Sequence, residues 1–170
     1  MNRIITTLCL STLLTASTAI CTGGETAESK VDPTVKEALM GSHIGYQNDE
    51  EGNFHLNVKF KSGRHQKVIV ISLPIQLGAE PDGEELREIY SVAFATSQAP
   101  SAELTARLLT ENGTAKFGSW VIRKNGEKFE IGFRALIPAE ACEDELLPSV
   151  SLVASYADGL ENKETEKDEN

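Results

Sequence analysis

The sequence lacks the motifs that mark most enzymes. It contains no nucleophile elbow around a serine, no glycine-rich phosphate loop after a strand and no helix with paired histidines. Its three histidines, His43, His55 and His65, have no spacing that would direct two rings at one metal ion. We therefore predict a non-catalytic protein that holds no cofactor and no metal.

Positive charge is also scarce. The chain has 16 Lys and Arg residues against 26 Asp and Glu residues, for a formal net charge of −10, and the cations form no basic patch. Removal of residues 1–19, which include Arg3 and no acidic residue, changes the net charge to −11. Nucleic acids and anionic lipid surfaces are bound through clustered Lys and Arg, so this acidity argues against both as partners.

The amino terminus carries an uninterrupted apolar stretch. Arg3 precedes an uncharged run at residues 4–19, and Ser17-Thr18-Ala19 supplies the small residues that signal peptidase requires. The run is too short and too rich in hydroxyl side chains for a membrane span, so residues 1–19 are predicted to be a secretory signal peptide that is cleaved after Ala19. The mature protein would then be periplasmic or extracellular, with no stable membrane span.

Cysteine is rare, and its positions leave alternatives open. Cys9 lies in the predicted signal peptide, so the mature chain keeps Cys21 and Cys142. These two could form a disulfide in an oxidising compartment, or stay separate thiols. Cys21 could instead carry the lipid of an envelope lipoprotein, although Ile20 stands where a lipobox requires a small residue. Residues 20–31, with Gly, Thr, Ser and Glu, are predicted to be a flexible spacer.

The first folded segments are predicted to be a helix and a strand. Asp32-Pro33 is typical of a helix N-terminus, and Val35, Leu39 and Met40 form a short apolar stripe after it. Apolar and polar residues alternate from Phe54 to Phe60, which predicts a strand with one buried face. The sequence Ser62-Gly63 then predicts a turn.

Two further strands follow. Val68–Leu73 is almost entirely apolar, as expected of a central strand, and Pro74 ends it. Arg87–Thr96 is predicted to be the next strand after the turn residues Pro81-Asp82-Gly83. Its two faces are predicted to consist of Ile89, Ser91, Ala93 and Ala95 on one side, and Tyr90, Val92 and Phe94 on the other.

The second half predicts a helix, a hairpin and a last helix. Leucines at helical spacing lead to Asn112-Gly113, a pair suited to the left-handed conformation that ends a helix. Phe117–Arg123 and Phe129–Ile137 are predicted hairpin arms, with Asn125-Gly126 at the centre of a type I′ turn. The last helix has an apolar stripe at steps of three and four, made of Leu146, Val150, Val153, Ala157 and Leu160.

The ends of that last helix are marked by proline and by charge. Pro148 predicts a late start or a kink in its first turn, because proline removes a backbone hydrogen bond. The run from Glu161 to Asn170 contains no apolar residue and is predicted to fray, which leaves residues 162–170 as a charged disordered tail.

Several of these segments resemble the second half of YbjN-like domains: Leu108–Asn112, Lys116–Trp120, Phe133–Pro138, Glu145–Leu147 and Ala157–Glu161. The resemblance covers most of the region from about Val35 to Glu161, within a domain predicted at residues 32–161. It implies an α+β fold similar to type III secretion chaperones, with an antiparallel sheet under packed helices in the order α-β-β-β(β)-α-β-β-α. It also implies non-enzymatic protein binding, and the homodimers common among such chaperones.

A few polar motifs have a chemical and a structural interpretation, and we favour the structural one. Asp49, Glu51 and Asn53 have the spacing of the first ligands of a calcium loop. The glycine that such a loop requires at its sixth position and the glutamate that it requires at its twelfth are missing, so these residues predict a polar turn. The acids Glu143-Asp144-Glu145 are explained by the dipole of a helix start. Asn112-Gly113-Thr114 matches a glycosylation sequon, and Trp120 is predicted to be a core residue rather than a ligand platform.

The sequence as a whole predicts an exported, non-catalytic domain that binds an unidentified protein, in a chaperone-like or regulatory role. The alternative is a small-ligand or metal-binding domain, enzymatic or not, whose binding pocket lies between the helices and the sheet. In one form of this alternative, the chain is a lipid-anchored envelope protein. An export signal departs from the family pattern, because secretion chaperones act in the cytoplasm.

Overall fold

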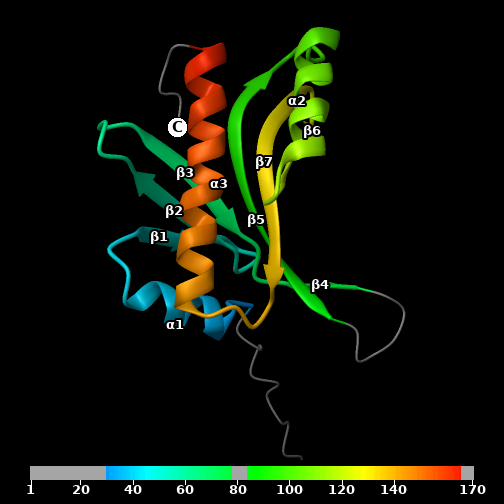
Figure 1. The fold of residues 1–170 in the computed structure, drawn as a ribbon. Helices are drawn as coiled ribbons and strands as arrows, with labels where there is room; N and C mark the ends of the chain where they lie inside the picture. The colour runs from blue at the N-terminus through cyan, green and yellow to red at the C-terminus, as the bar shows by residue number, and fades with distance from the viewer. Residues whose placement is uncertain (1–29, 78–83, 166–170) are drawn as a thin grey trace, which may run out of the picture.

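An antiparallel sheet with helices on one of its faces forms the fold, which confirms the predicted α+β class (Figure 1). The computed structural model describes residues 30–77 and 84–165. Its elements, in chain order, are α1 (Pro33–Met40), β1 (Gly45–Asn48), β2 (Phe54–Lys59), β3 (His65–Val70), β4 (Ile75–Gln76), β5 (Glu85–Thr96), α2 (Ala102–Thr114), β6 (Ser119–Asn125), β7 (Lys128–Pro138) and α3 (Glu143–Glu164).

The strand order of the sheet is β1-β2-β3-β5-β7-β6, and β4 pairs with one end of β5. Every pairing is antiparallel. The long strands β5 and β7 pair along most of their length and form the centre of the sheet, while β1 and β6 lie at its edges. The short strands β1 and β4 were not predicted, because segments of four and two residues carry too little alternation to be recognised.

Helix α3 packs along the sheet and supplies much of the core (Figure 1). All five residues of its predicted apolar stripe are buried, which confirms that prediction. The sheet side of the core is made of alternating residues such as Val70, Ile89 and Phe133. Helix α1 packs against the first half of α3 and closes one end of the core.

The predicted start of α1 is confirmed. The Asp32 carboxylate accepts a hydrogen bond from the Val35 backbone N–H at 3.0 Å, and Pro33 occupies the first turn. The predicted place of Met40 in the apolar stripe is wrong, because its side chain is 74% exposed. Ala38 is buried beside Leu39 instead. At 100° per residue, Met40 lies well outside the arc that Val35 and Leu39 direct toward the core.

The predicted hairpin is confirmed, with a shift in its turn. Asn125 pairs with Lys128, so the two loop residues are Gly126 and Glu127 rather than Asn125 and Gly126. Gly126 has a φ of 59°, a backbone conformation that glycine adopts without a steric penalty.

Strand β5 contains an irregularity that alternation alone did not reveal. Its register with β7 shifts between Val92 and Phe94, so that Val92 pairs with Gly132 and Phe94 pairs with Ile131. The extra residue turns Phe94 toward the core, against which it packs. The predicted placement of Phe94 on the same face as Tyr90 and Val92 is therefore wrong.

Helix α3 is longer at both ends than predicted. It begins at Glu143 and runs through Pro148, so a late start is wrong. It also continues to Glu164, and Glu161 is completely buried rather than frayed. The buried apolar stripe holds the helix together across the proline, where one backbone hydrogen bond is missing.

Some predictions fall outside the described residues. These are the signal peptide, the cleavage at Ala19, the thiol of Cys21, all but the end of the spacer, and the tail from residue 166 onward. Within residues 30–77 and 84–165, no helix has the length and apolarity needed to span a membrane.

Candidate functional site

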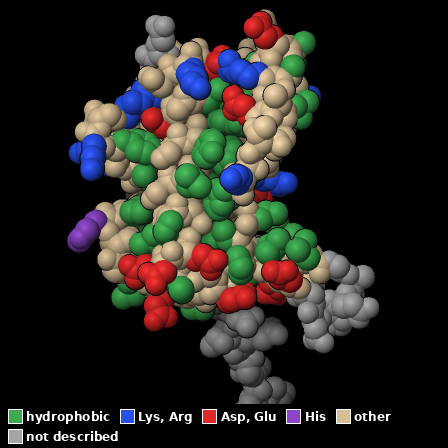
Figure 2. Space-filling view, viewed as in Figure 1, with side chains coloured by type: hydrophobic (Ala, Val, Ile, Leu, Met, Phe, Trp, Pro, Cys, Tyr) green, Lys and Arg blue, Asp and Glu red, His purple; other side chains and the backbone are tan. Residues whose placement is uncertain are grey.

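A groove between α2 and α3 is the candidate binding site. It has a volume of about 650 Å³, and its floor comes from β6 and β7. Figure 2 shows hydrophobic side chains gathered on this face between the two helices. The lining residues that matter most are Phe117, Trp120, Phe133, Leu152, Tyr156 and Leu160.

Three aromatic rings form the floor and one wall of this groove. The rings of Phe133 and Tyr156 are stacked, with centroids 4.3 Å apart and an interplanar angle of 6°. Trp120 meets Phe133 edge-on at 5.0 Å and is only 7% exposed, so its predicted core position is confirmed. Tyr156 and Leu152, one turn apart on α3, are each 39% exposed. The aromatic cluster is therefore anchored in the core and open on the groove side.

The last turn of α2 holds Trp120 in place. The Asn112 side-chain amide donates to the Trp120 carbonyl at 3.0 Å, and its oxygen accepts from the Trp120 backbone N–H at 2.7 Å. The indole Nε1–H donates to a Glu111 carboxylate oxygen at 2.7 Å. The Asn112 amide thus takes the place of a neighbouring strand at the edge of the sheet.

This pairing corrects the prediction that Asn112-Gly113 ends the helix. Helix α2 continues to Thr114, and Gly113 does not adopt the left-handed conformation. The two hydrogen bonds from Asn112 to Trp120 explain the residue better than a helix stop, because they need the asparagine inside the last helical turn. They also engage the amide nitrogen to which a glycan would be attached.

Charged residues border the groove. Lys116 and Lys163 line it on the hairpin side and the α3 side respectively, and neither makes an ion pair within residues 30–77 and 84–165. The acids nearby are already engaged, since Glu111 accepts from Trp120, and Glu164 pairs with Arg107 at 2.5 Å. Among the described residues, the border of the groove therefore holds two unpaired cations, Lys116 and Lys163, and one carboxylate, Glu111, whose partner is a neutral indole.

The predicted polar turn before β2 is confirmed. The Asp49 carboxylate accepts hydrogen bonds from the backbone N–H groups of Glu51 and Asn53, each at 2.9 Å, and lies 2.9 Å from His55 Nε2. The contact with His55, together with those from Asn53 and Glu51, lowers the pKa of Asp49 to about 2. The carboxylate therefore closes the turn by accepting hydrogen bonds from the backbone of that turn, and both of its oxygens already have partners.

The other predicted site residues do not converge. His43 follows α1, His55 faces outward from β2, and His65 begins β3. Across the part of the chain that the structure describes, no group of three His, Cys, Asp or Glu residues is arranged to hold a metal ion. The acids Glu143-Asp144-Glu145 form the first turn of α3, where the helix dipole favours them. Cys142 is exposed just before them, and its pairing with Cys21 stays a prediction.

Leu152 and Tyr156 are the groove residues that the sequence did not reveal. They lie beside the buried stripe of α3 and widen its apolar face, which was the available signal. The molecule is an α+β protein with an aromatic groove between two helices. No family model and no curated protein matches the chain. Its function is therefore inferred from the groove itself.

Proposed function

We propose that this chain is an exported, non-catalytic protein-binding domain whose groove holds an apolar segment of a partner. The observation that carries this proposal is the exposure of Leu152 and Tyr156 directly beside the buried rings of Trp120 and Phe133. Contiguous exposed apolar side chains on a folded surface commonly mark an interaction site. A groove between two helices suits the apolar face of an amphipathic helix from a partner.

The chain's only tryptophan gives a direct test of groove occupancy. A synthetic amphipathic peptide of leucine, alanine and glutamine is expected to shift the Trp120 fluorescence emission to shorter wavelength, because it excludes water from the indole surroundings. Leu152→Glu is expected to weaken this binding about tenfold or more, since the change removes an apolar contact of about 1.5–3 kcal/mol and places a charge in the groove.

Leu109→Glu is the matched control for that experiment. Leu109 lies on α2, is 65% exposed and does not line the groove. The control variant is expected to bind the peptide as the unchanged protein does. Equal losses in both variants, or no emission shift with the unchanged protein, would contradict a peptide-binding groove.

A small apolar ligand is the second candidate occupant. The groove volume of about 650 Å³ falls in the range of small-molecule sites, roughly 300–1,000 Å³. If a small ligand is the natural occupant, native mass spectrometry of the purified protein will show a bound molecule of constant mass, and its removal will be needed before the peptide shifts the Trp120 emission. A protein without such a molecule, and with direct peptide binding, favours the first candidate.

Export is a separate part of the proposal, and it is supported by the apolar residues 4–19 after Arg3. Intact-mass measurement of the protein recovered from each cell fraction is expected to show loss of residues 1–19. A lipid adduct on Cys21 would instead place the domain on a membrane surface. A full-length chain in the cytoplasmic fraction would contradict export and return an intracellular chaperone role to first place.

We also infer kinship with YbjN-like domains. The shared α+β class, with a hairpin followed by a last helix, supports this kinship. Self-association as a homodimer is expected from the same kinship.

A further inference from the structure

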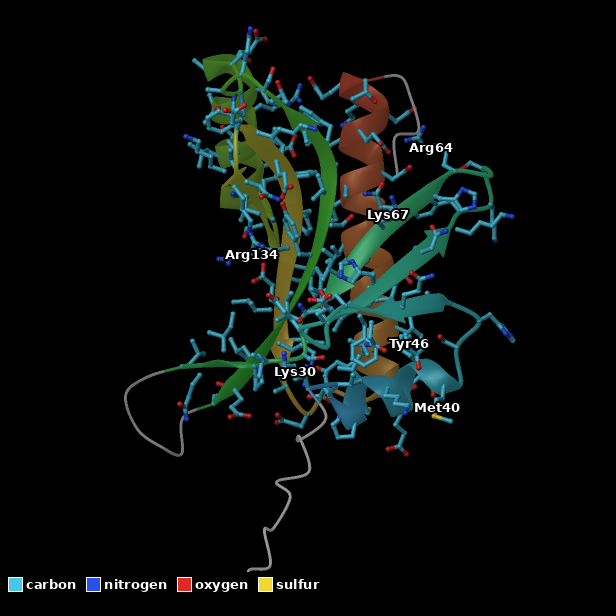
Figure 3. The ribbon with its side chains drawn as sticks, turned by 180° about the vertical axis from the view of Figure 1, so that it is seen from behind. Lys30, Met40, Tyr46, Arg64, Lys67 and Arg134 are labelled. Carbon is cyan, nitrogen blue, oxygen red and sulfur yellow. The ribbon has the colours of Figure 1, made fainter. Side chains whose placement is uncertain are left out.

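The face of the sheet opposite the helices carries unpaired positive charge, which is unusual for a protein of net negative charge. Helices α2 and α3 lie on one face, and Figure 3 shows the other face, with Lys67 on β3 and Arg134 on β7. No helix of the described residues covers this open face. It forms a surface separate from the groove.

Strand register defines a row of side chains across this open face. Successive pairings join one residue from each of the six strands in the main order, and alternation along the strands directs all of them away from the helices. The row consists of Gln47, His55, Ile69, Tyr90, Arg134 and Ser119. Lys67 and its partner Asn57 belong to the adjacent row.

The centre of the open face is neutral. The Tyr90 ring lies 4.1 Å beneath the Arg123 guanidinium, and the residue is 4% exposed. Burial raises the pKa of Tyr90 to about 12, so its phenol stays uncharged at neutral pH. Gly132 makes this packing possible, since a Cβ there would lie 2.5 Å from the Ser91 carbonyl oxygen and 2.7 Å from the Tyr90 hydroxyl.

The acids of the open face are occupied by internal partners. Glu88 pairs with Arg123, whereas Glu130 accepts a hydrogen bond from the neutral Asn125 amide at 2.8 Å and keeps its charge. Lys67 and Arg134 make no ion pair within the described part of the chain. Lys67 and Arg134 together outweigh the charge of Glu130, so these residues give the open face net positive charge on a protein with a net charge of −10.

We propose that the open face binds an acidic, extended segment of a partner protein through Lys67 and Arg134. Standard strand spacings place these two residues roughly 12 Å apart, because they are two strands and two positions apart, and this span equals three to four extended residues. Carboxylates at that spacing can meet both cations while the segment lies over Ile69 and over the Arg123 guanidinium that covers Tyr90. The free cations of this face are too sparse to hold a phosphate backbone against the overall negative charge, which favours a polypeptide over a nucleic acid.

The test uses the full chain and a fluorescein-labelled peptide of about twelve alternating glutamates and serines, at about 50 mM salt where screening is weak. The peptide has no apolar residue, so it does not probe the groove. Fluorescence anisotropy is expected to show saturable binding that Lys67→Glu combined with Arg134→Glu weakens about tenfold. The variant with Lys36→Glu and Lys124→Glu is the charge-matched control, because Lys36 lies on α1, and alternation places Lys124 on the helix side of β6.

The control variant is expected to lose about twofold at most, through the change in net charge alone. Equal losses in the two double variants would overturn the proposal, as would failure of the unchanged protein to bind the peptide. Tighter binding of a single-stranded oligonucleotide than of the peptide would overturn it in favour of a nucleic acid. A dimer in sedimentation analysis that only the Lys67 and Arg134 variant dissociates would identify a second copy as the occupant instead.

Discussion

Substitution of Arg87 by methionine is expected to lower the free energy of unfolding by about 3–5 kcal/mol, the cost of breaking a buried ion pair on one side. Urea denaturation followed by circular dichroism measures this loss as a lower midpoint. Since small domains have about 5–15 kcal/mol of stability, the variant is expected to be partly unfolded near its working temperature.

The reason lies in the contacts of the Arg87 guanidinium, whose side chain is 2% exposed. It donates to the carbonyl oxygens of Ile71 at 2.9 Å, Ser72 at 3.0 Å and Ala139 at 2.9 Å. It also pairs with the Asp32 carboxylate at 2.6 Å, which caps α1. One cation therefore joins β5, the end of β3, the start of α1 and the loop before α3. Methionine fills a similar space but leaves these acceptors without a donor.

Arg107→Met provides the comparison. Arg107 pairs with Glu164 at 2.5 Å, yet its side chain is 46% exposed, and such surface pairs contribute about 0–1 kcal/mol. If the two variants lose similar stability, the role assigned to Arg87 as a buried junction is wrong. A change in the slope of the urea transition without a change in midpoint would contradict it as well.

Local signals in the sequence predicted the local structure well. The cap at Asp32, the hairpin arms around Gly126 and the apolar stripe of α3 each depend on residues close together in the chain. The junction at Arg87 depends on four segments that are distant in sequence. A single arginine within a strand pattern shows neither its burial nor its partners, so alternation could not predict this role.

The groove shows the same limit. Sequence periodicity predicted α2, β6 and α3 as separate elements, and it placed Trp120 in the core. The groove exists because Asn112 fixes α2 to the edge strand, while Tyr156 stacks on Phe133 from α3. Both contacts are tertiary, and neither follows from the spacing of residues within one element. The shift of Phe94 to the core is similar, since one extra residue in β5 reverses the alternation.

The buried end of α3 leads to a second large effect. Glu161→Lys is expected to lower the free energy of unfolding by about 3–5 kcal/mol, because it places an unpaired ammonium group in the protein interior, next to the Arg64 guanidinium. Glu161 is completely buried, and its carboxylate accepts from the Arg64 guanidinium at 2.9 Å. Arg64 also pairs with Asp158 at 2.7 Å, one turn earlier on α3. These contacts attach the turn before β3 to the last helix.

Glu164→Lys is the matched control, since it makes the same change one turn further along the helix. The Glu164 side chain is 28% exposed and pairs with the half-exposed Arg107, so the expected loss is about 1 kcal/mol or less. Thermal and urea unfolding of both variants measures the difference. If the carboxyl end of α3 frayed into solvent, as the charged sequence from Glu161 onward indicates, both substitutions would be nearly neutral. A large loss confined to Glu161→Lys means that the helix continues as a packed element, because its buried acid neutralises a cation from the turn before β3.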